Sequence, residues 1–337
     1  MSHEITVRED GFAEAIYSRT PAWHLLGHVE KDRDLVSDDL IPYVDWTPLL
    51  QPLLRTSKDG EQHHSKYAVS VVRSDTEEEL GSVSPNYQTY GHLDGIRLLD
   101  TLMMDGIMKY EAAFSLQGGR NVVVVAQIPG VYEVAEGDAS LPFIMAIFNH
   151  TGQQRVRFLP TAIRPVCANT VGMALAQGKG QILSVRHSGD MELKMDQVRD
   201  ALSEINEAFT DHTKVARQLA QVKVTNDTWV PFLNDLFPVP QVTDPEFTQR
   251  KQNSVRQTRM AIKRNFLEDP AQQIPSTRHS WYAAFNAVTQ WVDHHEYKGT
   301  DDVAKAETRF RVANLGTGND LKTKAWSSAI DHALLEN

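Results

Sequence analysis

The sequence has little cysteine and few long apolar runs. Cys167 is its only cysteine, so one chain cannot form an internal disulfide, which favours a reducing, intracellular compartment. The longest apolar runs, Leu141–Phe148 and Val122–Ile128, fall far below the roughly 18 residues that a membrane-spanning helix needs. Residues 1–10 lack the basic-then-apolar order of a secretory signal. We therefore expect a cytoplasmic protein that makes no membrane contact.

The sequence also lacks the usual motifs for nucleotides and metals. Five residues separate Gly172 from Gly178, where a phosphate-binding loop has four, and the Ser or Thr that would hold magnesium is missing. No Gly-x-Gly-x-x-Gly occurs, so a dinucleotide-binding fold has no support. The clusters His63–His64 and Asp293–Glu296 lack the His-x-x-x-His spacing that puts two ligands on one helix face. We expect neither a cofactor nor a metal.

Chain length and net charge limit the number of domains and the kind of partner. The chain has 337 residues, about twice the size of a typical domain, so one large domain or two packed units are both open. Its apolar share, with glycine counted and tyrosine left out, is roughly 44%, close to the globular average. The net charge of −10 argues against a wholly basic coat for nucleic acid and leaves a local basic patch possible.

The chain divides by composition into four segments. Residues 1–60 are polar, with prolines and isolated aromatic side chains, and predict an arm or a peripheral subdomain. Residues 61–224 carry the strand and helix patterns of a core domain. Residues 225–245 contain four prolines, which is typical of a linker. Residues 246–337 predict a helical C-terminal region.

Hairpins followed by helices recur within the core segment. Residues 66–84 predict a hairpin and residues 87–104 an amphipathic helix. Residues 110–128 predict a second hairpin around Gly118-Gly119, and residues 141–159 a third, which leads into a helix over residues 169–177. Further helices are predicted over residues 190–224, 244–267, 279–297 and 322–335. This order predicts an α+β fold with an antiparallel, hairpin-rich sheet, helices on one face and a helical C-terminal region.

The strongest functional signal is a basic stretch, Gln249–Arg264, which contains no acid. Its cations are Arg250, Lys251, Arg256, Arg259, Lys263 and Arg264. On a helix, Val255, Ile262 and Phe266 would form the buried stripe, with Arg256 and Lys263 beside it and Arg250 and Arg264 behind it. Such a surface could follow a phosphate backbone. A merely solvated helix that pairs with the acidic remainder of the chain is the open alternative.

A second basic group comes from the third hairpin and the residues after it. Its members are Arg155, Arg157, Arg164, Arg186 and His187. Period two places Arg155 and Arg157 on one face of a strand. Asn169 and Thr170 would start the next helix, where free backbone donors and a neighbouring Arg suit an anion. Equally open is the possibility that Arg164 and Asn169 only hold the loop together by hydrogen bonds.

Cys167 offers a catalytic alternative. A thiolate with His150 or His187 as its base could act as a nucleophile. A lone cysteine in the apolar setting Pro165-Val-Cys-Ala168 is more often a small buried side chain. We therefore expect no enzyme activity.

Three stretches carry a resemblance to a known family: Asn149-His-Thr-Gly152, Thr161–Val171 and Ile182–His187. They are similar to the signature of the phage/plasmid-like family of unknown function, whose core block reads roughly Arg-Val-Val-Cys-x-Asn-Thr. Segments near both ends of the chain are similar as well, and Pro165 departs from the usual Val. The resemblance implies a phage, prophage or plasmid context without an assigned activity. The layout also resembles that of phage single-strand annealing proteins of the RecT and Erf types, which is a fold-level analogy.

These observations predict a phage or mobile-element protein that binds single-stranded DNA and assists annealing or recombination as a homo-oligomer. The predicted nucleic-acid contacts are Arg155, Arg157, Arg164, Asn169, Arg186 and His187 in a groove and Arg256, Arg259, Lys263 and Arg264 in the tail. The alternatives are a module that binds a host or phage protein through its acidic surface and, third, a Cys/His enzyme.

Overall fold

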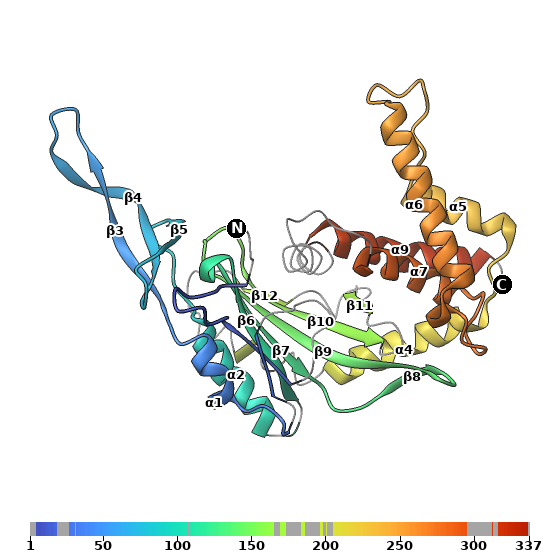
Figure 1. Cartoon of the computed structure of the whole chain (residues 1–337), viewed down its shortest axis with the longest axis horizontal. Coiled ribbons are helices and arrows are strands. Elements are labelled where there is room, and N and C mark those ends of the chain that lie inside the picture. The colour runs from blue at the N-terminus through green and yellow to red at the C-terminus, as the bar shows by residue number, and fades with distance from the viewer. Residues whose placement is uncertain are drawn as a thin grey trace.

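The fold is α+β, as predicted (Figure 1). The computed structural model describes residues 5–18, 27–30, 32–104, 106, 108–164, 169–172, 183–185, 196–197, 200, 205–294, 312 and 316–335. In that part of the chain a large sheet occupies the middle of the molecule, a small sheet extends from one end, and a group of helices lies at the other end.

The large sheet contains nine of the described strands, and all of its pairs except β1–β2 are antiparallel. Its main path runs β11-β10-β9-β7-β6-β1-β2, with β12 paired to β10 and β8 paired to β9. The strands are β1 (Ala15–Tyr17), β2 (His28–Val29), β6 (Lys109–Leu116), β7 (Asn121–Gln127), β8 (Tyr132–Ala135), β9 (Asp138–Asn149), β10 (Val156–Arg164), β11 (Asn169–Gly172) and β12 (Leu183–Val185). The predicted hairpins over residues 110–128 and 141–159 are the pairs β6–β7 and β9–β10.

The middle strands of this sheet are buried on both faces. Along β7, Val122, Val124 and Ala126 enter one apolar core, and Val123 and Val125 enter another, because successive side chains of a strand point to opposite faces. The first core lies against α1 (Ser37–Leu40) and α2 (His92–Met104), which cover one face of the sheet (Figure 1). The short 3₁₀ turn Ile41–Tyr43 comes directly after α1.

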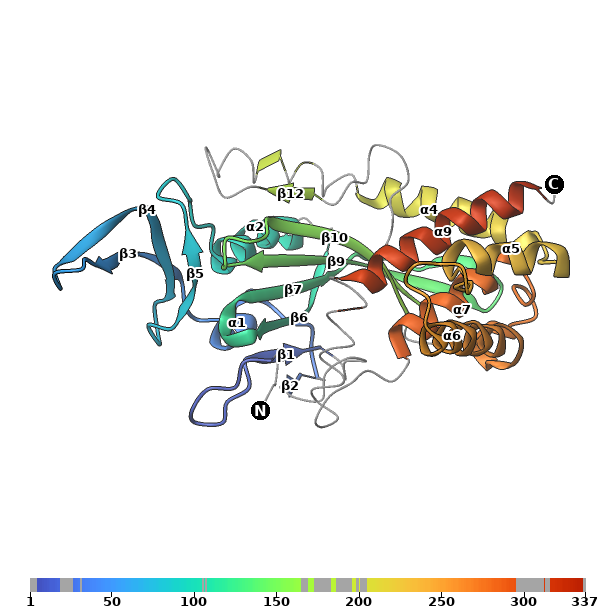
Figure 2. The ribbon, with the colours of Figure 1, turned by 90° about the horizontal axis from the view of Figure 1, so that it is seen from above.

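A small three-stranded sheet makes a projecting arm. It consists of β3 (Pro48–Thr56), β4 (Gln62–Arg73) and β5 (Glu79–Val83), in that order. At its base, Val71, Leu80 and Val83 join the first core. Beyond Val69 only β3 and β4 remain paired, and this two-stranded ribbon extends away from the molecule in both views (Figures 1 and 2). We call this three-stranded sheet, residues 48–83, the arm.

Five of the described helices build a second apolar region at the other end. They are α4 (Ile205–Gln221), α5 (Asn226–Leu236), α6 (Gln249–Glu268), α7 (Trp281–His294) and α9 (Thr317–Leu335). A 3₁₀ turn, Pro270–Gln272, comes after α6. Their shared core, which we call the helical core, contains large aromatic side chains such as Trp229, Phe232 and Trp281.

Two sequence predictions are corrected here. Asn169 and Thr170 do not start a helix: both lie in β11, where Asn169 is opposite Arg164 and Thr170 is opposite Ile163 of β10. Pairing with a strand that is already in the sheet overrides the local helical pattern. The proline-containing segment predicted as a linker holds α5 instead, with Pro231 inside the helix and Trp229, Phe232, Leu233 and Leu236 buried.

Hydrogen bonds join the sheet to the helical region. Arg217 of α4 donates from Nε and Nη2 to the carbonyl oxygen of Glu133 in β8, at 3.0 and 2.8 Å. Thr277 donates to the buried carboxylate of Asp138, at the start of β9, at 3.0 Å. These contacts fix the helices at the β8–β9 end of the sheet.

Candidate nucleic-acid interface

Helix α6 has strong local reasons to form. The Thr248 side chain caps its start by accepting a hydrogen bond from the backbone N–H of Lys251 at 3.1 Å. Its 20 residues include no glycine or proline, and Pro270 comes just after its end. The helix therefore owes much of its stability to its own sequence.

Most of α6 lies outside the helical core. Only Ile262 and Phe266 are buried, and both lie in its second half. The Phe266 ring stacks on Trp229 of α5 with centroids 4.7 Å apart. The first half of the helix has no buried residue, and Figure 1 shows it projecting from the other helices. The C-terminal half of the helix is thus anchored by packing, and the N-terminal half extends into solvent.

The six cations of α6 divide into two groups. Lys251 forms an ion pair with Glu246 at 3.0 Å. Arg259 is half-buried, donates to the side chain of Asn234 at 2.9 Å, and has its pKa lowered by burial. The remaining cations are Arg250, Arg256, Lys263 and Arg264, which are all exposed. Within the described residues, none of these four has a hydrogen-bond or ion-pair partner.

The predicted groove residues are placed only in part. Arg155 is exposed just before β10. Arg157 lies in β10, opposite Ile147 of β9, and its Nη2 donates to the side chain of Gln154 at 2.6 Å. Burial lowers the pKa of Arg157. The backbone of Arg164 ends β10, but its side chain, Arg186 and His187 lie outside the part of the chain that the structure describes.

Among the described residues, Arg155 and Arg157 lie apart from the cations of α6. The far end of β10 pairs with β11, and β11 contacts α7 and α9 of the helical region. Arg155 and Arg157 lie at the opposite end of that strand. Figures 1 and 2 place α6 among the helices, beyond the end of the sheet. The α6 cations therefore form a surface of their own.

His150, the candidate base for Cys167, is part of a buried network. Its Nε2 lies 3.1 Å from Nδ1 of His92, whose Nε2 lies 2.8 Å from the carbonyl oxygen of Val44. Both imidazoles are at most 1% exposed and pack against the Trp46 ring. Burial lowers the pKa of His92 to about 4. His150 therefore has no open face toward solvent, while Cys167 and His187 lie outside the described residues.

The same network contains a buried ion pair that no sequence pattern indicates. Arg73 of β4 donates to Glu14 from Nη2 at 2.7 Å and from Nη1 at 3.2 Å. It also donates to Asp75 from Nε and Nη2, at 2.9 and 2.7 Å. Burial by itself lowers the pKa of Arg73, but these carboxylates outweigh it and raise the pKa. The Arg73 guanidinium lies 4.5 Å from the Trp46 ring, so the network fastens the arm to the large sheet.

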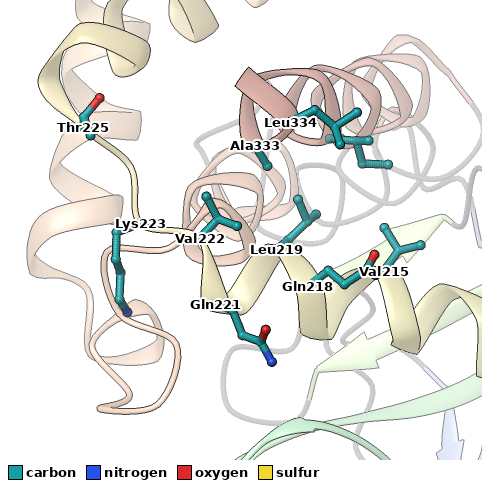
Figure 3. A pocket seen from close by; sticks show the side chains of 10 residues that line it. Val215, Gln218, Leu219, Gln221, Val222, Lys223, Thr225, Ala333 and Leu334 are labelled. Carbon is teal, nitrogen blue, oxygen red and sulfur yellow. The ribbon is translucent and has the colours of Figure 1, made fainter. Parts of the chain in front are cut away.

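A groove of about 640 Å³ lies between α4 and the end of α9. Figure 3 shows Leu219 of α4 and Val222, just after that helix, on one side and Ala333 and Leu334 of α9 on the other. Among the described residues that line it, none is an acid, a histidine or a cysteine. Its lysine, Lys223, donates to the carbonyl oxygen of Arg278 at 2.8 Å. These described lining residues offer no cluster of cations to a polyanion.

Other candidate chemistry is also accounted for in the described chain. Asp293, from the Asp293–Glu296 cluster whose spacing is unsuited to a metal, forms a buried ion pair with Lys322 at 2.5 Å. Across the described ranges, no three His, Cys, Asp or Glu side chains group as metal ligands would. Among the described helices, none has the length and apolar character needed to cross a bilayer. The exposed cations of α6 remain as the best candidate site.

Comparison with known proteins gave one match. Residues 79–324 fit the family model described as Domain of unknown function (DUF932). This range includes the large sheet from β6 onward, α6, and part of α9. A search of curated proteins and a search of solved structures each returned no match.

Proposed function

We propose that this chain, which belongs to the family described as Domain of unknown function (DUF932), binds single-stranded DNA. The observation that carries this proposal is the set of four exposed cations on α6, without partners among the described residues, in a chain of net charge −10. Cations that no acid neutralises are free to replace the counterions of a phosphate backbone.

The proposed biological role is assistance in annealing or recombination. Annealing is driven by base pairing, so the protein need supply only a cationic surface and hold strands extended. The resemblance of Asn149–Gly152 and Thr161–Val171 to phage and plasmid proteins supports a mobile-element setting. A homo-oligomer would repeat the α6 surface along a strand, which is how sequence-independent binders gain cooperativity.

The test is the salt dependence of binding, measured by fluorescence anisotropy with a labelled oligothymidine. Four phosphate contacts predict a slope of log K against log salt of about −3. Arg256→Gln/Lys263→Gln removes two contacts and should halve that slope. The control, Arg97→Gln/Lys214→Gln, removes one exposed Arg and one exposed Lys elsewhere, 76% and 65% exposed, and should leave the slope unchanged. Absence of binding at low salt, or equal slopes in both variants, would overturn the proposal.

A specific observation favours a second function, binding of a protein partner. The arm exposes Leu49 and Leu54, at 45% and 53%, and Tyr67 at 89%. A two-stranded ribbon with apolar side chains in solvent is only marginally stable by itself. If pull-down recovers a stoichiometric protein that resists nuclease, and Leu54→Ser/Tyr67→Ser loses it, this second function is supported.

A further inference from the structure

Helix α6 exposes two apolar side chains among its cations. Met260 is 71% exposed and Leu267 is 43% exposed. They are seven residues apart, so they lie on one face, about 10 Å apart along the helix axis. This face points away from the buried Ile262 and Phe266.

Cations lie between and beside these two apolar positions. Lys263 and Arg264, with Met260 and Leu267, line a shallow surface hollow of about 580 Å³, whose lining also includes one acid, Glu268. Arg256 lies one turn before Met260 on the same side of the helix. An apolar contact and a phosphate contact are therefore available within one turn of each other.

Single strands and duplexes differ in the groups that they offer such a surface. Both present phosphates, but only unpaired bases present their flat apolar faces to a side chain, since a duplex stacks them inside. Thioether and aliphatic groups pack well on aromatic rings. From this geometry we propose that Met260 and Leu267 contact unpaired bases and give α6 its preference for single strands, an inference that rests on the proposed function.

Charge complementarity selects nucleic acid over other occupants of this face. A helix that lies on a membrane, or in the groove of an apolar partner, needs a wide apolar stripe. The exposed side of α6 has Met260 and Leu267 as its large apolar side chains, with Asn253 and Gln257 between the cations and Glu268 at its end. Four exposed cations, without partners in the described part of the chain, beside two apolar groups fit a polyanion with apolar rings.

The test compares Met260→Gln/Leu267→Gln with the intact protein on oligothymidine and on a duplex, at one salt concentration. Both residues are exposed, so the variant should fold normally, which an unchanged melting temperature would verify. Affinity for the single strand should fall about tenfold, and affinity for the duplex and the salt slope should stay the same. The matched control, Val230→Gln/Val242→Gln, replaces two exposed apolar residues elsewhere, 52% and 78% exposed, and should change neither affinity.

The outcomes separate this inference from the function on which it rests. If Arg256→Gln/Lys263→Gln lowers the salt slope while Met260→Gln/Leu267→Gln leaves the ratio of single-strand to duplex affinity unchanged, only the inference about Met260 and Leu267 fails. If the intact protein binds neither nucleic acid, both fail. Binding to anionic vesicles that disappears in Met260→Gln/Leu267→Gln would assign this face to a lipid surface and overturn the inference.

Discussion

Replacing Glu14 by Gln should destabilise the protein by about 3 kcal/mol. Glu14 is fully buried and accepts hydrogen bonds from Arg73, which is 2% exposed, and from Nε of Arg8 at 3.1 Å. Breaking a buried ion pair costs roughly 3–5 kcal/mol because it leaves a charge without compensation. Arg73 keeps both bonds to Asp75, so the low end of that range applies. The glutamine can still accept one hydrogen bond but brings no negative charge.

Equilibrium unfolding in urea measures this loss directly. The control is Glu61→Gln: Glu61 is 78% exposed and near His63, so its loss should cost less than about 0.5 kcal/mol. Glu14→Gln/Arg73→Met removes both charges and should recover about 1 kcal/mol or more relative to Glu14→Gln alone. A loss below about 1 kcal/mol in Glu14→Gln would refute the reasoning, because Asp75 alone would then suffice for Arg73.

Two further predictions concern packing and pH. Gly95→Ala would place a Cβ atom 2.0 Å from Cζ of the buried Phe148. The resulting overpacking should lower the stability by about 1–3 kcal/mol, seen as a lower melting temperature. In the control Gly91→Ala the atom nearest to the new Cβ is 3.4 Å away, so the melting temperature should hardly change. His92 has a pKa of about 4 in the folded state, below the value of about 6.5 in the unfolded chain. As the pH drops, the unfolded chain therefore takes up a proton on this imidazole before the folded chain does. The stability should fall by up to about 3 kcal/mol between about pH 6.5 and about pH 4. Urea unfolding at several pH values should show this fall, and His92→Gln should flatten it; an equal fall in that variant would assign the pH dependence to other groups.

Local patterns are sufficient for much of the fold. The β6–β7 hairpin is evident from the Gly118-Gly119 turn and the run of valines in β7 that follows it, because turn residues and β-branched side chains act locally. Helix α6 is predicted over residues 244–267 and spans Gln249–Glu268. Its cations are also predictable from the local sequence, because the first 16 residues of the helix contain no acid that could form an ion pair with them.

Nonlocal packing decides the features that local patterns miss. Composition assigns residues 48–56 to a polar N-terminal segment that contains prolines. Pro48 and Pro52 lie in β3, an edge strand, where a missing backbone donor is tolerated. Pro231 similarly suggests a linker, but α5 buries four apolar side chains, which offsets the roughly 3 kcal/mol cost of a proline inside a helix.

The buried network is beyond sequence-based prediction for a related reason. Glu14, Trp46, Arg73, His92 and His150 come from five separate segments, and no sequence spacing relates them. Only the meeting of the arm with the large sheet brings them into contact. In the sequence, each of these residues looks like an ordinary surface residue or a single aromatic side chain among polar residues.

Helix α4 has a consequence for how the molecule unfolds. Its early residue Phe209 belongs to the core under the sheet, with its ring 5.8 Å from that of Tyr132, and its later residues Ala216 and Leu219 belong to the helical core. One continuous helix thus contributes to both cores, and neither can lose its packing without exposing part of the other. The two ends of the molecule should therefore melt in a single cooperative transition, and a fragment that begins after Val224 would lack the helix that covers one side of its own core.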